Sequence, residues 1–230
     1  MSAIKTPLLL LLFLGLFLGA SHAVSGQSPS VLRIYLARHG QTDWNADHRL
    51  QGATDTVLNG AGREQAAKLA ERLRGLKMDA VYSSTLRRSL ETANTVRGPV
   101  PLEALAGLNE RRLGMFEGRR VDASDPLTAR EYARRSQEPD DTLDGGESLR
   151  QFFDRVRTTV MAIRSQRPSG TILIVGHGGT NQMIVRALLE LSAQQAQSFE
   201  QANDDLYAID LGPGSPARLW KWIELHGPQK

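Results

Sequence analysis

The amino-acid sequence predicts an α/β protein: a three-layer sandwich with a mostly parallel central sheet, helices on both faces and an antiparallel edge strand. Three observations support this fold class. Apolar runs at residues 32–37, 79–83 and 171–175 have the length of buried strands. Amphipathic helical patterns separate these runs, as crossover connections of a parallel sheet require. Two further strand patterns near the carboxyl end are joined by a Gly- and Pro-rich turn short enough for antiparallel pairing.

The first half of the chain reads as strand and helix in alternation. Asn59 is a suitable N-cap for the first helix, and Gly98-Pro99 ends the second. The predicted elements are a strand at 32–37, a polar loop to Leu58, a helix from Asn59 to about Gly75, a strand at 79–83, a helix from Leu86 to Val96, a strand at 100–102 and a polar loop at 105–118.

The second half contains the clearest helix and the strongest strand. Ser124-Asp125-Pro126 is an N-cap followed by proline in the first turn, which predicts a short helix through Arg135. The other predicted elements are a loop at 138–146, a helix with apolar positions from Leu149 to Ile163, a central strand at 171–175, a helix whose buried face extends to Leu191, and strands at 206–211 and 217–224.

The amino-terminal residues are expected to lie outside the folded domain. Lys5 precedes an apolar run from Leu8 to Ala20, which is shorter than the about 20 residues of a membrane span. Ser21-His22-Ala23 then resembles a signal-peptidase site, so residues 1–23 are predicted to be a signal peptide and residues 24–30 a disordered leader. The predicted location is secreted or periplasmic, and an uncleaved membrane anchor is the alternative. The predicted domain is 31–230.

Composition excludes several classes of partner and site. The chain has 28 basic and 25 acidic residues, a formal net charge of +3, and no basic block with interleaved aromatic residues, so no nucleic-acid partner is expected. It has no cysteine, which excludes disulfides and thiolate metal sites. After signal cleavage no membrane contact is expected either.

Two predicted strands end in a histidine beside a glycine. Arg38-His39-Gly40 follows the first strand and Gly176-His177-Gly178 follows the strand at 171–175. Because the carboxyl ends of parallel strands share one edge, His39 and His177 are expected to meet there. Arg38, Arg88 and the amino terminus of the helix after His177 would add positive charge at that edge. The sequence therefore predicts a binding site for a dianion. A phosphoryl group is the expected ligand, because the paired N–H donors of arginine match its oxygens.

The chain resembles the histidine phosphatase superfamily, also called phosphoglycerate mutase-like, from about Leu32 to Leu211. The matching motifs, in order, are Arg38-His39-Gly40 with Thr42, Trp44 and Asn45; Arg49-Leu50-Gln51-Gly52, Asp55, Leu58, Gly62 and Gln65-Ala66; Tyr82-Ser83-Ser84 with Leu86, Arg88 and Glu91-Thr92-Ala93; Leu108, Glu110, Gly114 and Phe116-Glu117-Gly118; Gly145-Gly146-Glu147-Ser148; and Val175-Gly176-His177-Gly178-Gly179.

The resemblance implies a role for each matching residue. His39 would be the nucleophile that takes the phosphoryl group, and Glu110 would protonate the leaving oxygen and later deprotonate water. Arg38, Arg88 and His177 would hold the phosphoryl oxygens. The implied substrate-binding residues are Arg38, Asn45, Gln51, Gly52, Arg88, His177 and Gly178. No metal and no cofactor is implied. His39 must be neutral to attack, and Glu110 is expected in a partly desolvated position.

The predicted function is an exported phosphatase that hydrolyses small phosphate monoesters through a phosphohistidine on His39. A phosphoglycerate mutase-type phosphotransferase is one alternative, but it must exclude water, and the span from Glu110 to Gly146 is short for a cover. A non-catalytic phosphate-ester binding module is another. A metal-dependent hydrolase would use His39, Asp43, Asp47, His48 and His177.

Overall fold

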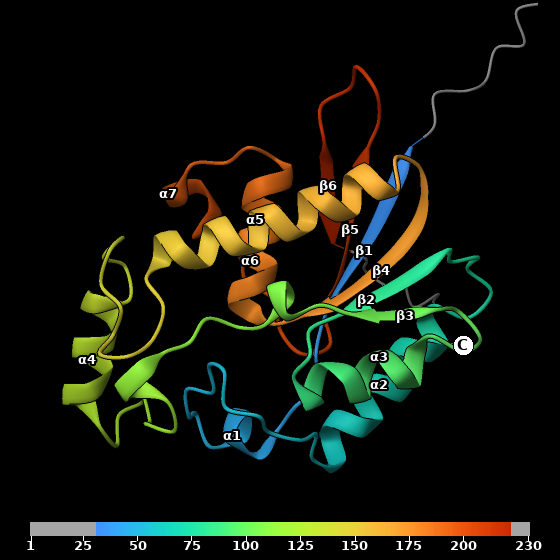
Figure 1. Cartoon of the computed structure of the whole chain (residues 1–230). Coiled ribbons are helices and arrows are strands. Elements are labelled where there is room, and N and C mark those ends of the chain that lie inside the picture. The colour runs from blue at the N-terminus through green and yellow to red at the C-terminus, as the bar shows by residue number, and fades with distance from the viewer. Residues whose placement is uncertain (1–30, 222–230) are drawn as a thin grey trace, which may run out of the picture.

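The structure, a computed structural model, describes residues 31–221, which form one six-stranded sheet in the order β3-β2-β4-β1-β5-β6 (Figure 1). The strands are β1 (Leu32–Arg38), β2 (Ala80–Ser83), β3 (Leu102–Ala104), β4 (Gly170–Gly176), β5 (Leu206–Leu211) and β6 (Arg218–Lys221). The first four strands are parallel, whereas β5 pairs antiparallel with β1 and β6 pairs antiparallel with β5. The predicted fold class is confirmed.

Helices cover both faces of the sheet, as Figure 1 shows. Helices α5 (Leu149–Gln166) and α6 (Gly178–Leu188) lie on one face, and α2 (Gly60–Arg72) and α3 (Arg87–Val96) lie on the other. The remaining helices are α1 (Asp43–Ala46), α4 (Pro126–Arg135), α7 (Ala193–Ala196) and the 3-10 turns η1 (Ala106–Leu108) and η2 (Gly114–Phe116). Helix α1 begins five residues after β1 ends, near the carboxyl edge of the sheet.

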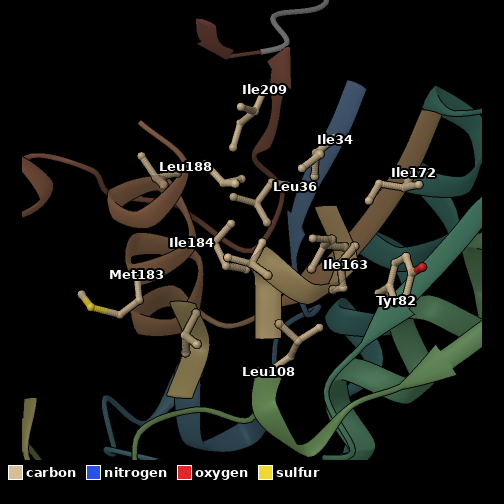
Figure 2. Close-up of a cluster of buried hydrophobic side chains, with 14 of the residues drawn as sticks. Ile34, Leu36, Tyr82, Leu108, Ile163, Ile172, Met183, Ile184, Leu188 and Ile209 are labelled. Atoms are coloured by element: carbon tan, nitrogen blue, oxygen red, sulfur yellow. The ribbon is translucent and has the colours of Figure 1, made fainter. Parts of the chain in front are cut away.

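The alternation of side chains along β1 separates two hydrophobic cores. Ile34 and Leu36 face α5 and α6, in the core that Figure 2 shows together with Ile184. Tyr35 and Ala37 point to the opposite face, toward α2 and α3. Complete burial of each large aliphatic side chain contributes about 1.5–3 kcal/mol, so β1 is held from both faces.

Several predicted boundaries are wrong, mainly at short elements. The third strand is Leu102–Ala104 rather than 100–102, because Pro101 offers no N–H and Val100 still belongs to the turn after Arg97. The loops predicted at 38–58 and 105–118 contain α1, η1 and η2. Helix α6 ends at Leu188 rather than Leu191, and α7 was not predicted. A single helical turn gives no periodic pattern, so these elements leave no signal in hydrophobicity.

The last predicted strand, 217–224, is observed as Arg218–Lys221, and its final three residues lie outside the described part of the chain. Residues 1–23 and 24–30 also lie outside it, so the signal peptide and the leader stay predictions. Within residues 31–221, no helix has the length and apolar character needed to cross a membrane.

The loop after β1 touches the first turn of α2 backbone against backbone. A Cβ on Gly40 would lie 2.3 Å from the Gly62 carbonyl oxygen, and a Cβ on Gly62 would lie 2.0 Å from the Gln41 carbonyl oxygen. Both positions therefore require glycine. This contact fixes the path of the chain immediately after His39.

We expect Gly62→Ala to lower the free energy of unfolding by about 1–3 kcal/mol, because the new methyl group must displace backbone. Gly60→Ala in the same helix is the matched control, since no atom lies within 4 Å of its Cβ position. It should leave stability unchanged or slightly raised. Urea denaturation of both variants measures the difference, and equal stabilities would contradict the close contact.

Candidate active site

The pairing of β1 with β4 brings His39 and His177 together. Arg38 is in register with Gly176, and the His39 N–H donates to the Gly176 carbonyl at 3.0 Å. The two imidazole centroids lie 5.0 Å apart at an interplanar angle of 57°. Both side chains are buried. The two strand-end histidines thus occupy one site, as the parallel sheet predicted.

The tautomer of His39 follows from its hydrogen bond. Nδ1 lies 2.8 Å from the carbonyl oxygen of Gly40, which can only accept, so Nδ1 carries the proton. In a neutral ring the lone pair is then on Nε2. Burial holds the pKa of His39 well below its ordinary value of 6.5, and the charges of Arg88 and Arg38 lower it further. His39 is therefore neutral at pH 7 and offers Nε2 as a nucleophile, as its predicted role requires.

His177 is also neutral, because burial lowers its pKa well below 6.5 and Arg88 adds to the effect. Its Nε2 lies 2.7 Å from the Ser84 hydroxyl. Its Nδ1 is buried and has no hydrogen-bond partner in the described part of the chain. That nitrogen is consequently available to a ligand.

Arg38 and Arg88 are held by backbone carbonyl oxygens rather than by carboxylates. Arg88 is fully buried and donates from its two terminal nitrogens to Thr54 and Gly52 at 2.8 Å each. Arg38 donates to the Gln201 carbonyl at 2.9 Å. Burial lowers the pKa of Arg88 to about 10 and also lowers that of Arg38, and both stay protonated at pH 7.

The Nε atoms of both arginines are buried without a partner among residues 31–221. Buried donors that carry a positive charge strongly favour an anionic acceptor. The two guanidinium groups and the two histidines therefore suit an oxyanion such as a phosphoryl group.

The amino terminus of α6 closes the same site. His177 is its N-cap, and Gly178 packs against Arg38, where a Cβ would lie 3.7 Å from the guanidinium carbon. The Gly179 N–H donates to Glu110 Oε2 at 2.9 Å, and a Cβ there would approach Glu110 Oε1 to 2.7 Å. Glycine at 179 thus allows the carboxylate to contact the helix terminus, whose dipole favours negative charge.

Glu110 is half-buried, as expected. Besides the Gly179 N–H, its carboxylate accepts hydrogen bonds from the Arg111 N–H at 2.9 Å and the Thr180 hydroxyl at 3.3 Å. The same hydroxyl lies 3.1 Å from the Asn109 carbonyl oxygen, so its single proton is shared between the two acceptors. Glu110 is therefore anchored to the first turn of α6, beside Arg38.

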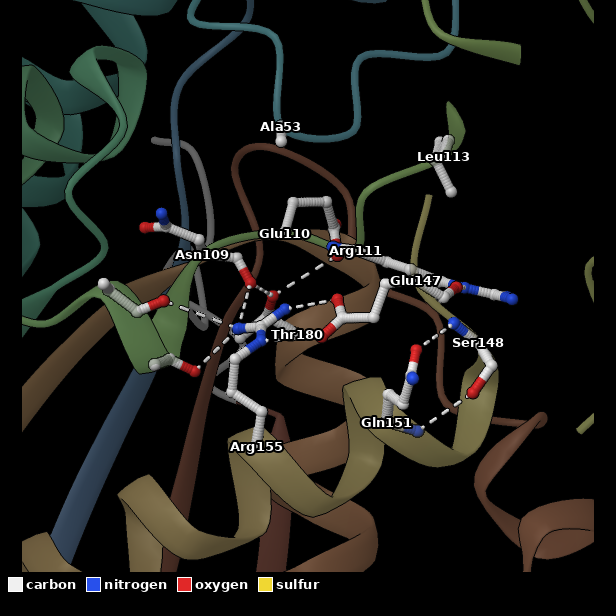
Figure 3. Close-up of polar contacts among 12 residues, drawn as sticks. Ala53, Asn109, Glu110, Arg111, Leu113, Glu147, Ser148, Gln151, Arg155 and Thr180 are labelled. Carbon is white, nitrogen blue, oxygen red and sulfur yellow. Dashed lines mark hydrogen bonds and ion pairs between the residues drawn. The ribbon is translucent and has the colours of Figure 1, made fainter. Parts of the chain in front are cut away.

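Arg155 of α5 binds the backbone of the loop that carries Glu110 (Figure 3). One terminal nitrogen of Arg155 donates to the carbonyls of Gly107 and Asn109 at 2.9 and 3.0 Å. Its other two nitrogens bind the Glu147 carboxylate at 2.9 and 2.7 Å. The Glu147 side chain is only 6% exposed, so the carboxylate of this ion pair is almost completely shielded from solvent. Glu147 thereby fixes Arg155, and Arg155 fixes the segment next to Glu110.

A cavity of about 540 Å³ opens at the carboxyl edge of the sheet. Every predicted site residue except His177 lines it, and His177 lies buried next to His39. The predicted lining residues are Arg38, His39, Asn45, Gln51, Gly52, Arg88, Glu110 and Gly178. Asn45 and Gln51 are partly engaged in the loop, because the side-chain oxygen of each accepts from Thr42 at 3.1 Å.

Sequence reasoning missed most of the outer cavity wall. Its further polar residues are Arg49, Arg111, Tyr132, Ser136, Gln137, Gln182, Arg186 and Gln197. The sequence spacing could have indicated two of them, Gln182 and Arg186. Gly178, Gln182 and Arg186 are spaced by four, which places all three on one face of a helix. Tyr132 and Gln137 gave no signal, because only the packing of the α4 segment brings them to the site.

The residues of the metal-hydrolase alternative do not form a ligand cluster. Among residues 31–221 there is no group of three or more histidine, aspartate or glutamate side chains placed to hold a metal ion. His48 is exposed, whereas His39 and His177 are buried. The acidic side chain beside the two histidines is that of Glu110, which belongs to the loop between η1 and η2 and accepts a hydrogen bond from the Gly179 N–H of α6.

Comparison with known proteins finds relatives that belong to one family. The family model for the histidine phosphatase superfamily (branch 1) matches residues 34–222. Phosphoglycerate mutase-like protein 4 of Arabidopsis thaliana is 37% identical over 196 residues, which are 82% of this chain and 84% of the relative.

Two solved structures show the same fold. A putative alpha-ribazole-5'-P phosphatase from Escherichia coli K-12 superposes with a TM-score of 0.74 at 27% identity, covering 83% of this chain and 95% of that one. A phosphoserine phosphatase from Entamoeba histolytica, in complex with 3-phosphoglyceric acid, has a TM-score of 0.71 at 26% identity, covering 82% and 94%.

The neutral histidines make stability depend on pH. Below pH 6.5 the unfolded chain binds protons on these imidazoles that the folded protein does not, so stability falls as the pH is lowered. We expect His39→Asn to reduce this loss by about 1.4 kcal/mol per pH unit between about pH 6 and pH 5. Urea unfolding at several pH values measures it. His48→Asn, which changes an exposed imidazole, is the control, and an unchanged slope in His39→Asn would contradict a neutral buried ring.

The Arg155–Glu147 pair should be asymmetric in its contribution to stability. Arg155→Met leaves a carboxylate that is 6% exposed without its partner, and we expect a loss of about 3 kcal/mol. Glu147→Gln leaves Arg155, which is 28% exposed, with its carbonyl acceptors, and should cost only about 1–2 kcal/mol. Arg157→Met, an exposed position on the same helix, is the control. Equal losses for the first two variants in denaturant unfolding would contradict this account.

Proposed function

The chain belongs to the histidine phosphatase superfamily, and from this we propose that it hydrolyses small phosphate monoesters through a phosphohistidine on His39. One observation carries the proposal. The hydrogen bond from Nδ1 to Gly40 leaves a lone pair on Nε2 of a neutral imidazole, beside the buried Arg88 and the partly buried Arg38, neither of which forms an ion pair with a carboxylate of residues 31–221. This arrangement provides a nucleophile and a binding site for the charge of a transferring phosphoryl group.

In the first step the phosphoryl oxygens bind Arg38, Arg88 and the free Nδ1 side of His177. The lone pair of His39 Nε2 attacks phosphorus as the bond to the ester oxygen breaks. Glu110, held against the α6 terminus, donates a proton to that oxygen, and the alcohol leaves. The phosphoryl group is then bonded to Nε2, and the Nδ1 proton still donates to Gly40.

In the second step water attacks phosphorus from the side that the alcohol has left. The Glu110 carboxylate takes a proton from this water, so the residue returns to its protonated form. The bond between phosphorus and Nε2 breaks, its electron pair returns to the ring, and inorganic phosphate departs. Arg38 and Arg88 stabilise the charge of both transition states, because they remain protonated throughout.

A mutase is the second candidate, since relatives are named phosphoglycerate mutase-like protein or probable phosphoglycerate mutase. The cavity wall supports hydrolysis instead. The α4 segment and the α7 segment meet across the cavity through a hydrogen bond of 2.7 Å between Gln137 and Gln197, and both side chains are exposed. An exposed hydrogen bond of this kind contributes little and does not hold water out. We therefore favour transfer to water over transfer to a second alcohol.

Export is part of the proposal as well. It rests on the apolar run and the Ser21-His22-Ala23 site within residues 1–23. The enzyme would then act on phosphate esters outside the cytoplasm.

We expect a rapid quench with a phosphate ester of a good leaving group to trap acid-labile, base-stable phosphate on the protein, because phosphohistidine has these stabilities. His39→Ala should trap none, and His48→Asn should behave as the native protein. Glu110→Gln should slow phosphoenzyme formation more for a poor leaving group than for a good one, because only the poor one needs the proton.

Several outcomes distinguish the candidates. Bound ester without any phosphoenzyme in the native protein would indicate the non-catalytic binding module. Discharge of the phosphoenzyme to an added alcohol in preference to water would indicate the mutase. Activity that survives in His39→Ala would exclude the phosphohistidine.

A further inference from the structure

Arg186 is the one cation of the cavity wall that the described residues leave without a polar partner. Its Nε is buried and unpartnered, and no hydrogen bond or ion pair joins its guanidinium to any of residues 31–221. The guanidinium carbon lies 3.9 Å from the ring centroid of Phe153. Stacking on a ring restricts the guanidinium without neutralising it, so its donors remain free for a ligand.

The other arginines of the wall are already engaged. Arg111 donates to the carbonyls of Glu147, Ser136 and Asp141. Arg49 lies 3.5 Å from the Asp47 carboxylate. The full set of charged lining residues is Arg38, Arg49, Arg88, Arg111, Arg186 and Glu110. Arg38 and Arg88 match the charge of a phosphoryl dianion, and the donors of Arg111 are taken up by carbonyl oxygens, so Arg186 keeps both its charge and its donors for a ligand.

The position of Arg186 separates it from the phosphoryl end. Gly178, Gln182 and Arg186 follow one another at intervals of four on the cavity face of α6. Eight residues of α-helix correspond to about 12 Å, and side chains lean back toward the amino terminus of their helix. Arg186 therefore presents a second positive charge on the order of 10 Å from the phosphorus.

The cavity wall also carries apolar side chains that suit a carbon chain. Leu113, Leu149, Phe152 and Met183 line the same cavity. These apolar side chains would contact the middle of an extended ester while its two polar ends meet the arginines.

From these observations we infer that the substrate is a phosphate monoester with a second oxyanion at its far end, and that Arg186 binds this group. The inference rests on the proposed function for the phosphoryl end of the cavity. It assigns Arg186 to substrate specificity, because it lies too far from His39 to act on the reacting atoms.

The test uses ω-phosphooxyalkanoates of three to eight carbons, each compared with its primary amide. The pair differs only in the distal charge, so the ratio of the two kcat/KM values isolates the contribution of that charge. We expect the ratio to reach about tenfold to a hundredfold at the longer chain lengths, as a hydrogen-bonded ion pair gives. It should be close to one for the shortest chain, which does not reach Arg186.

Arg186→Met keeps an apolar side chain on Phe153 but removes the charge. It should bring the ratio to about one at every length while changing kcat/KM for the amides less than about threefold. Arg164→Met removes one exposed positive charge from α5 and should leave the ratio unchanged, which controls for net charge. Arg186→Lys should retain part of the preference.

A ratio near one at all lengths in the native protein would overturn the inference, as would a preference that persists in Arg186→Met. Calorimetric binding of the matching ω-phosphonoalkanoates and their amides repeats the comparison without turnover. The native protein could bind the carboxylates more tightly than the amides, lose this preference in Arg186→Met, and hydrolyse no ester. That result would support the role of Arg186 in binding and reject the phosphatase activity. Hydrolysis of the amides with no preference in either assay would do the reverse.

Discussion

The parallel pairing of β1 with β4 is the constraint on which the rest of the site depends. The register continues from Leu32 opposite Gly170 to Arg38 opposite Gly176. The next residue after each strand is a histidine, so His39 and His177 lie side by side at the edge of the sheet. A slip by one residue would turn every side chain of β1 to the opposite face and move Ile34 and Leu36 out of their core. The hydrophobic cores on both faces exclude that slip. Core packing therefore also aligns His39 with His177.

Desolvation determines the chemistry of the aligned groups. Burial is the largest influence on the pKa of His39 and of His177, and it keeps both rings neutral. Burial lowers the pKa of Arg38 and of Arg88 as well, but both stay protonated at pH 7, and carbonyl oxygens accept hydrogen bonds from their terminal nitrogens. A buried cation without a carboxylate costs the folded protein several kcal/mol, which an anionic ligand would offset. The site thus combines a neutral imidazole, the proposed nucleophile, with two arginines that form no ion pair with a carboxylate of residues 31–221.

Distant segments supply the acid and the outer wall. Glu110 is placed by α6 through Gly179 and by α5 through Arg155, and the Glu147 carboxylate orients Arg155. Arg186, on the same helix as Gly179, extends the positive wall away from the phosphoryl end. One helix therefore contacts the proposed phosphoryl group, the acid and the proposed distal anion.

The sequence by itself determined the α/β alternation, the strand-end positions of His39 and His177 and the matching residues of the family, because strand periodicity and motif order are local properties. It missed single-turn elements such as Asp43–Ala46 and Ala193–Ala196, which are too short for a periodic pattern. Only the tertiary structure decided the tautomer of His39, the pairing of Arg155 with Glu147 and the place of Arg186 in the cavity. Burial and contacts between segments far apart in the chain arise from packing, and hydrophobic periodicity does not encode which polar groups that packing brings together.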